Sequence, residues 1–292
     1  MLYDSLREKI LPLPDDTQVY PAHGAGSLCG KSLSKETWST LGQQRQFNYA
    51  LRPMAKEEFV SLVACGQTEV PAYFPKSAAV NLRGARFLDE LPEPRQASGP
   101  EILAFEGVVL DVRNAAEFGA GHISGALNIG LGGQFASWAG TLIEVGTPVA
   151  IAAERIEQVG EAVMRLARVG IETVKSFILM EEWPYETAKI EQVPVDKMNE
   201  LLSSRPDVQF VDVRREGEYT GGHAPGAVNL TLSDLGKLSG QLDASRPTYV
   251  ICQGGYRSSA GASILEKKGF RKLYNITGGT AAWIDAGLEI DM

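Results

Sequence analysis

The chain has 292 residues, of which 44% are hydrophobic and 31 are glycine, and this globular composition is enough for two or more ordinary domains. A net charge of -8 argues against nucleic acid and against an anionic membrane as partners, since no basic field would attract either. No stretch approaches the ~18 apolar residues of a membrane span, and the N-terminus lacks the order of a signal peptide. Three cysteines are few and odd in number, which is typical of a reducing compartment, so we expect a cytoplasmic protein.

Residues 1–85 differ in character from the rest of the chain. Helical spacing of apolar residues predicts helices over 5–10 and 56–64, with a short strand at 19–20 between them. The run Leu-Tyr-Asp-Ser-Leu-Arg-Glu-Lys-Ile, followed by Tyr-Pro-Ala-His-Gly, resembles the C-terminal third of a metallo-β-lactamase-fold persulfide dioxygenase. The resemblance implies that this block is a C-terminal remnant of that fold, lacking the N-terminal metal-binding portion.

His23 is the residue of this block that matches an iron ligand in the resembled family. A mononuclear metal site needs at least three protein ligands, and the family supplies the others from a His-x-His-x-Asp-His loop and an aspartate further upstream. The chain has only three histidines, the others being His122 and His223, so the site is incomplete. His23 is therefore either a remnant ligand position or an ordinary loop histidine. We expect no cofactor, with iron only if a separate metallo-β-lactamase-fold partner supplies the missing portion.

A linker and an internal repeat follow. The stretch 88–107 holds three prolines among charged residues, which is typical of a linker. Beyond it, residues 109–128 align without gaps on residues 210–229 at an offset of 101, with identical Asp, Val, Arg, Glu, Gly and His positions. The repeat predicts two related domains, which we call the first copy (residues 95–190) and the second copy (residues 193–292).

The two copies differ at one loop. Anchored on matching prolines and glycines, the alignment places Ala153 where Cys252 stands and Gln158 where Arg257 stands. The first copy also lacks the paired glycines of the second, so its backbone is a poorer source of aligned N–H groups. We therefore expect the first copy to be inactive, with a structural or docking role.

Each copy alternates strands with helices. Alternation of this kind predicts an α/β fold with a parallel sheet, helices on both faces, and chemically active loops at the C-terminal ends of the strands. In the second copy the expected strands are 209–213, 248–251 and 272–276, and the expected helices are 233–238 and 259–268.

A seven-residue loop in the second copy has the features of an anion cradle. It separates an apolar run from a helix-like run and reads Cys252-Gln253-Gly254-Gly255-Tyr256-Arg257-Ser258. A turn that opens a helix directs several N–H groups and the positive end of the helix dipole at one point. Those groups and Arg257 would stabilise the thiolate of Cys252, which is the reactive form of a cysteine. The alternative is that Cys252 is a buried small hydrophobic residue.

This loop resembles the active-site loop of the rhodanese family, Cys-x-x-Gly-x-Arg-Ser. Two further segments carry the resemblance, one upstream and one downstream: Asp212-Val213-Arg214 with Glu218-Tyr219 and Gly222-His223-Ala224-Pro225-Gly226-Ala227, and Gly278-Gly279-Thr280-Ala281-Ala282-Trp283. The resemblance implies a sulfurtransferase that holds sulfane sulfur as a cysteine persulfide. The whole chain resembles a fusion of the metallo-β-lactamase fold with two tandem rhodanese-like domains.

Roles for the loop residues follow from this chemistry. We expect Cys252 to be the nucleophile and Arg257 to supply positive charge to the loop and to an anionic donor. The backbone N–H groups of the other loop residues are expected to stabilise the thiolate and bind the substrate, and the two glycines are needed for backbone conformation: Gln253, Gly254, Gly255, Tyr256 and Ser258. Ser258 could equally cap the following helix. Because Asp212, Arg214 and His223 recur in the first copy, we expect them to hold the fold together.

Three functional hypotheses remain. The first is a sulfurtransferase that moves sulfane sulfur from thiosulfate or a low-molecular-weight persulfide to a thiol or cyanide. Four residues separate Cys252 from Arg257, whereas related phosphatases and arsenate reductases have five, and the smaller ring suits one sulfur atom. The second hypothesis is a sulfur-relay or binding module of a split or truncated persulfide dioxygenase–rhodanese fusion. The third and weakest is dioxygenase activity by this chain alone.

Overall fold

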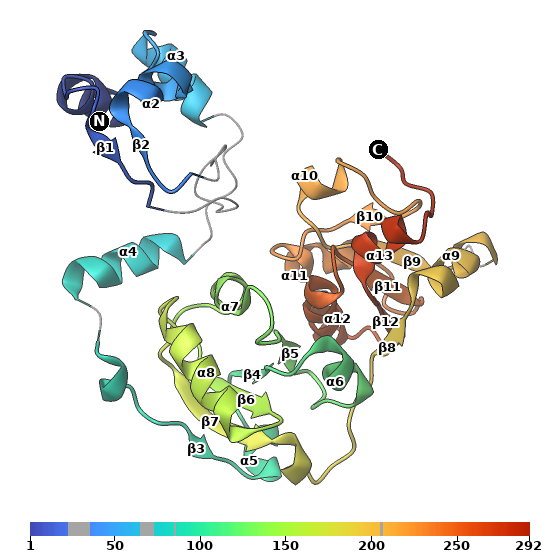
Figure 1. Cartoon of the computed structure of the whole chain (residues 1–292). Helices are drawn as coiled ribbons and strands as arrows, with labels where there is room; N and C mark the ends of the chain where they lie inside the picture. The colour runs from blue at the N-terminus through green and yellow to red at the C-terminus, as the bar shows by residue number, and fades with distance from the viewer. Residues whose placement is uncertain (23–35, 65–72, 85, 205–206) are drawn as a thin grey trace. The chain divides into compact units, whose positions relative to one another are not determined.

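A computed structural model describes residues 1–22, 36–64, 73–84, 86–204 and 207–292 (Figure 1). The chain divides into two compact units, Met1–Val70 and Pro71–Met292. His23, Cys29 and Cys65 lie outside the described residues. No helix in the described ranges combines the length and the apolar character needed to cross a membrane.

The first unit is a small assembly of short elements. Arg45 joins its segments, since one of its guanidinium nitrogens donates to the carbonyl oxygens of Leu11 and Leu13 at 2.6 and 2.7 Å. The expected helix at 56–64 is confirmed, whereas the expected helix at 5–10 begins earlier and ends in a π-helical turn. The described elements are α1 (Leu2–Ser5), the π-helical turn (Leu6–Ile10), β1 (Gln18–Val19), β2 (Ser39–Thr40), α2 (Leu41–Phe47) and α3 (Lys56–Ala64).

The second unit contains two five-stranded sheets built to one plan. In the first copy the strand order is β3-β7-β6-β4-β5, and in the second copy it is β8-β12-β11-β9-β10, with every pairing parallel. The first copy consists of β3 (Arg95–Gln96), α5 (Gly99–Leu103), β4 (Val108–Asp111), α6 (Ala115–Ala120), β5 (Leu127–Asn128), α7 (Phe135–Leu142), β6 (Val149–Ala153), α8 (Ile156–Ala167) and β7 (Val174–Leu179).

The second copy repeats this sequence of elements and adds a helix at its end. Its elements are β8 (Glu191–Val193), α9 (Val195–Ser204), β9 (Gln209–Asp212), α10 (Glu216–Tyr219), β10 (Val228–Asn229), α11 (Leu235–Leu238), β11 (Thr248–Ile251), α12 (Tyr256–Lys267), β12 (Leu273–Ile276) and α13 (Gly279–Asp285). Helices cover both faces of its sheet, α11 and α12 on one and α9 and α13 on the other (Figure 1). The predicted α/β fold with two tandem parallel-sheet domains is thereby confirmed.

Alternation along the strands explains why both faces are covered. Val211 and Val250 belong to the apolar cluster on the α12 side, whereas Phe210, Tyr249 and Trp283 belong to the cluster on the α13 side. Successive side chains of a strand point to opposite faces, so a strand buried on both faces is apolar throughout. The α12-side cluster also includes residues of the first copy, which makes the apolar core continuous across the two copies.

The segment just before the expected boundary at residue 85 contacts the first copy. Helix α4 (Phe74–Arg83) and the preceding Tyr73 belong to the second unit. The Tyr73 ring lies in the apolar cluster of the first copy, and a Cβ on Gly140 of α7 would approach it to 2.7 Å. Burial of this aromatic ring attaches the segment to the first copy, because an aromatic side chain contributes a large apolar area wherever it packs.

Candidate active site

Cys252 follows directly after the central strand of the second copy. All four residues of β11 are buried, and its neighbours β9 and β12 run parallel to it on either side. The strand ends at Ile251, so the cysteine lies at the carboxyl edge of the sheet, where active loops of parallel sheets are found. Cys252 is 1% exposed. The alternative of a buried hydrophobic residue therefore has to be judged from the atoms that face the sulfur.

Two polar groups face the Cys252 sulfur. The backbone N–H of Gly255 donates to Sγ at 3.2 Å, and the hydroxyl oxygen of Ser258 lies 3.3 Å from it. Gly255 has a φ of 89°, in the left-handed region that favours glycine, and this conformation turns its N–H toward the sulfur. Ser258 is fully buried, so its hydroxyl has no access to water and faces the sulfur instead. Two polar groups beside the sulfur are more than a purely apolar cysteine requires, and both are able to donate a hydrogen bond to a thiolate.

Helix α13 holds the back of the loop. The N–H groups of Thr280 and Ala281 donate to the carbonyl oxygens of Cys252 and Gln253 at 2.8 and 3.0 Å. A Cβ on Gly279 would overlap the Cys252 carbonyl, so only glycine allows this approach. Because the loop carbonyls are bound on this side, the loop amides are turned the other way. The downstream signature of the sequence thus orients the loop backbone.

Arg257 forms an ion pair with Glu218, which the sequence analysis did not predict. Its two terminal nitrogens donate to the two carboxylate oxygens of Glu218, each at 2.7 Å. Burial opposes the charged guanidinium, but the hydrogen bonds to Glu218 raise the pKa of Arg257 above its usual value. The same hydrogen bonds hold the pKa of Glu218 below its usual range, against the effect of its own burial. A signal existed in the repeat, since Glu117 matches Glu218 but only the second copy has the arginine.

The remaining candidate residues separate into three groups. Gln253 and Gly254 are exposed, and Gly254 has no positive φ and open space where a Cβ would stand, so the expected need for glycine is seen at Gly255 only. Ser258 faces the sulfur. Tyr256 turns away from its own copy, and its hydroxyl donates to the carbonyl oxygen of Gly130 at 2.8 Å.

The corresponding loop of the first copy is closed by its own side chain. The register pairs Asp111 with Ala152 in the first copy and Asp212 with Ile251 in the second, so Ala153 occupies the position of Cys252. The Oε1 atom of Gln158 accepts the N–H groups of Glu154 and Arg155 at 2.8 and 3.1 Å. Two amides that could form a cradle are thus occupied by the Gln158 side chain, while the inactivity of the first copy stays a prediction.

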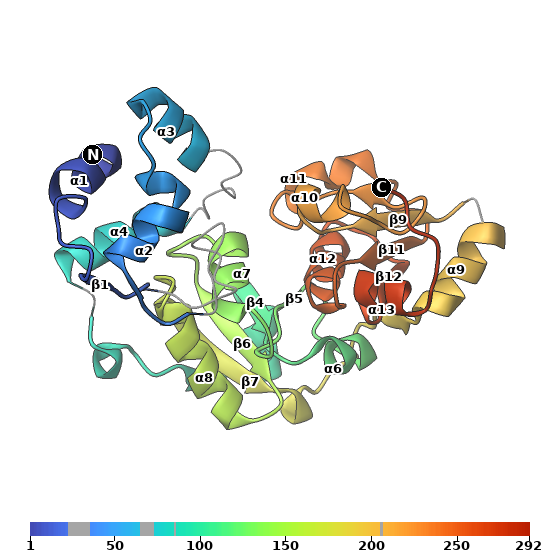
Figure 2. The same ribbon diagram turned by 45° about the horizontal axis from the view of Figure 1, so that its top comes forward.

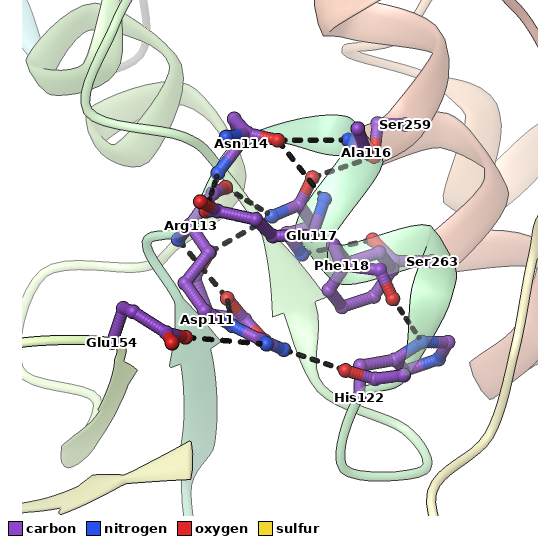
Figure 3. Close-up of polar contacts among 12 residues, drawn as sticks. Asp111, Arg113, Asn114, Ala116, Glu117, Phe118, His122, Glu154, Ser259 and Ser263 are labelled. Atoms are coloured by element: carbon purple, nitrogen blue, oxygen red, sulfur yellow. Dashed lines mark hydrogen bonds and ion pairs between the residues drawn. The ribbon is translucent and has the colours of Figure 1, made fainter. Parts of the chain in front are cut away.

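The shared signature residues hold each copy together. Arg113 donates to Asp111, with a shortest distance of 2.6 Å, and to the carbonyl oxygen of Gly121 (Figure 3). Arg214 makes the same contacts with Asp212 and with the carbonyl oxygen of Gly222. Both pairs are buried. Their occurrence in both copies favours the structural role expected for them.

The described residues offer no metal centre. His23 falls outside them, and within them no three or more His, Cys, Asp or Glu side chains are grouped to hold an ion.

Comparison with known proteins assigns the family. The rhodanese-like domain family matches residues 90–178 and again residues 195–286. The chain belongs to the rhodanese-like domain family. The chain is 36% identical over 85 residues to thiosulfate sulfurtransferase GlpE of Shewanella oneidensis, covering 29% of this chain and 84% of that protein. It is 39% identical over 75 residues to the uncharacterized protein YqhL of Bacillus subtilis, covering 26% of this chain and 60% of that protein.

A solved structure resembles a longer part of this tandem rhodanese. The metallo-beta-lactamase from Staphylococcus aureus aligns with a TM-score of 0.51 and 26% identity, over 61% of this chain and 49% of that one. The chain thus spans about half the length of this neighbour. The chain therefore has a metallo-β-lactamase structural neighbour, while the fusion suggested by the opening block stays a prediction.

Proposed function

We propose that this rhodanese moves sulfane sulfur from thiosulfate or a low-molecular-weight persulfide to a thiol or to cyanide through a persulfide on Cys252. The observation that carries the proposal is the pair of donors, the Gly255 N–H and the Ser258 hydroxyl, that face the sulfur at the edge of the sheet. They stabilise the thiolate, and the thiolate is the nucleophile. The similarity to a thiosulfate sulfurtransferase supports the same chemistry.

The reaction has two balanced steps. The Cys252 thiolate attacks the outer sulfur of thiosulfate, the sulfur–sulfur bond of the donor breaks, and sulfite leaves with the electron pair of that bond. Cyanide or a thiolate then attacks the outer sulfur of the Cys252 persulfide, and the Cys252 thiolate leaves with the electron pair. No metal and no external oxidant takes part, because the donor brings sulfur already in the transferable oxidation state. The Gly255 N–H and the Ser258 hydroxyl stabilise the negative sulfur before and after each step.

The loop arginine is not free to supply positive charge to an anionic donor as the sequence led us to expect. Both terminal nitrogens of Arg257 are bound to Glu218, so the pair brings no net charge to the loop. The groups that face the reacting sulfur are instead the Gly255 N–H and the Ser258 hydroxyl.

Intact mass measurement after incubation with thiosulfate tests the proposal. We expect a one-sulfur adduct on the protein, its absence in Cys252→Ala, and its removal by cyanide with release of thiocyanate. Ser258→Ala should load sulfur about tenfold more slowly, since a hydrogen bond to a charged group has been removed. No adduct on the protein, or an equal adduct on Cys252→Ala, would contradict the proposal.

A second candidate function is sulfur relay to or from a metallo-β-lactamase-fold portion, and the Staphylococcus aureus neighbour favours it. Oxygen uptake with glutathione persulfide would be measured with a persulfide dioxygenase of that fold, after addition of this chain or of Cys252→Ala. Relay predicts faster uptake with the intact cysteine only. Equal uptake with both proteins would exclude a relay through Cys252.

A further inference from the structure

One face of α12, the helix that follows the cysteine loop, contacts the first copy. Tyr256, Ser259, Ser263 and Glu266 each contact the first copy, and their spacing of three, four and three residues places them on one side of α12. The helix packs against β5 and α6, and both ribbon views show it beside them (Figure 1, Figure 2). The helix that begins at the cysteine loop is therefore also the main contact between the copies.

The middle of this face is joined by buried hydrogen bonds. The Ser259 hydroxyl donates to Oδ1 of Asn128 at 2.6 Å, and the Asn128 N–H donates to the Ser263 hydroxyl oxygen at 3.1 Å. Both serines face the polar network of the first copy in Figure 3. All three residues are buried, so loss of one partner would leave a polar group without water. The register of α12 on the first copy is consequently fixed.

The far end of the face is held by a charged group. Glu266 accepts the Gly125 N–H at 2.9 Å, and its two carboxylate oxygens each lie 3.2 Å from Nε2 of His122. Nδ1 of that ring faces the Phe118 carbonyl oxygen at 2.9 Å. Both ring nitrogens of His122 thus face oxygen atoms, one from each copy, and the ring links α12 to the first copy.

Of the four residues on this face, Tyr256 is the nearest in sequence to Cys252. Its hydroxyl donates to the Gly130 carbonyl oxygen at 2.8 Å, and its ring packs against the apolar cluster of the first copy. A Cβ on Gly133 would lie 2.8 Å from two atoms of this ring, so the glycine allows the close approach. Burial raises the pKa of the Tyr256 phenol, which keeps its donor proton in place. The guanidinium carbon of Arg257 also lies 6.0 Å from the ring centroid of Trp138 in the first copy.

The turn that contacts Tyr256 is fixed by hydrogen bonds from Arg165. Arg165 of α8 donates to the carbonyl oxygens of Leu131 and Gly133 at 2.6 and 3.0 Å, and its guanidinium lies over the Phe135 ring. The glycine-containing turn 130–133 is thereby attached to the body of the first copy. A side chain bound to it has a fixed position.

We propose that the first copy positions the sulfur-transfer loop of the second, with Gly130 and Gly133 as the platform and Tyr256 as the positioning residue. This inference rests on the proposed function of Cys252. Tyr256 lies directly between Gly255, whose N–H faces the sulfur, and Arg257, which binds Glu218. Displacement of the tyrosine ring therefore displaces the donor of the cradle. The copy without a nucleophile sets the geometry of the nucleophile in the other.

The test changes the platform from the side of the first copy. In Gly133→Ala the added methyl group forces the Tyr256 ring to move, and in Tyr256→Ala the anchor is absent. Gly132→Ala is the matched control, because a Cβ there meets nothing within 4 Å and neither glycine has a positive φ. The full chain is used throughout, with alkylation of Cys252 by iodoacetamide followed across pH and sulfur loading from thiosulfate measured by intact mass.

We expect both test variants to move the alkylation profile to higher pH and to load sulfur about tenfold more slowly, while Gly132→Ala behaves as the unchanged protein. A merely structural contact would lower thermal stability without moving the alkylation profile. Profiles of both test variants that coincide with that of Gly132→Ala would overturn the inference. If the unchanged protein loads no sulfur while the alkylation profiles differ, the proposed function fails and the positioning role stands.

Discussion

Replacement of Glu218 by glutamine tests how much the ion pair between Glu218 and Arg257 contributes to stability. Glu218→Gln keeps the size of the side chain and removes the charge that both terminal nitrogens of Arg257 contact at 2.7 Å. In the pair, the arginine side chain is 14% exposed and the glutamate side chain 36%. Hydrogen bonds to buried charged groups contribute ~1.5–3 kcal/mol and exposed ion pairs ~0.2–1 kcal/mol, so this half-covered pair should contribute about 1–2 kcal/mol.

The assay is urea unfolding of a double-mutant cycle with Glu218→Gln, Arg257→Gln and the double variant. We expect a coupling energy of about 1–2 kcal/mol near neutral pH. Glu117→Gln in the first copy is the matched control, since Glu117 accepts the Asn114 N–H at 3.2 Å just as Glu218 accepts the Arg215 N–H at 3.2 Å. That control removes the same helix-start contact in a copy where glutamine replaces the arginine.

The pH dependence has a definite sign. The hydrogen bonds from Arg257 hold the pKa of Glu218 in the folded protein below its ordinary value of 4.5. A depressed carboxyl pKa contributes stability that is complete above the unfolded pKa and is lost as the pH falls through the folded pKa. The difference between the unchanged protein and Glu218→Gln should therefore narrow below about pH 4.5. A coupling energy under about 0.3 kcal/mol, or an equal loss in Glu117→Gln, would refute the reasoning.

Two further predictions concern the loop and the contact between the copies. Gly255→Ala should lower the free energy of unfolding by about 1–2 kcal/mol and abolish sulfur loading, because alanine disfavours a φ of 89°. Gly254→Ala should leave stability and sulfur loading nearly unchanged. Urea unfolding measures the stability, and intact mass measures the sulfur loading. Glu266→Gln should lower the thermal midpoint at neutral pH. Burial alone would raise the pKa of Glu266, but hydrogen bonds from His122 and the Gly125 amide hold this pKa below its usual range. The loss of thermal midpoint in Glu266→Gln should therefore shrink as the pH falls below about 4.5. A loss that does not depend on pH would contradict the role given to the Glu266 carboxylate.

Local patterns were sufficient where the elements are continuous in sequence. The strand expected at 248–251 has those bounds, because an apolar run buried on both faces has few other conformations open to it. The helix expected from residue 259 begins at Tyr256 instead. Gly255 in the left-handed conformation ends the loop and precedes the first helical residue, and single-sequence patterns do not reveal which of two adjacent glycines takes that conformation.

The contacts of α4 were less predictable than its helical conformation. The segment precedes the expected boundary at residue 85, and the Tyr73 ring packs against the first copy. Nothing in the local sequence of α4 specifies the cluster against which a preceding aromatic ring packs. His23 stays a remnant ligand position by resemblance alone, since it lies outside the described residues.

The sequence by itself determined the repeat and the absence of the cysteine and the arginine from the first copy, and it indicated the candidate nucleophile, because residue identity and short-range spacing are enough for these. Only the tertiary structure decided the partners of the loop. Glu218 lies 39 residues from Arg257, and Gly130 lies 126 residues from Tyr256. Such contacts depend on how two sheets and their helices pack, and a hydrogen bond between distant residues leaves no periodic trace in the chain.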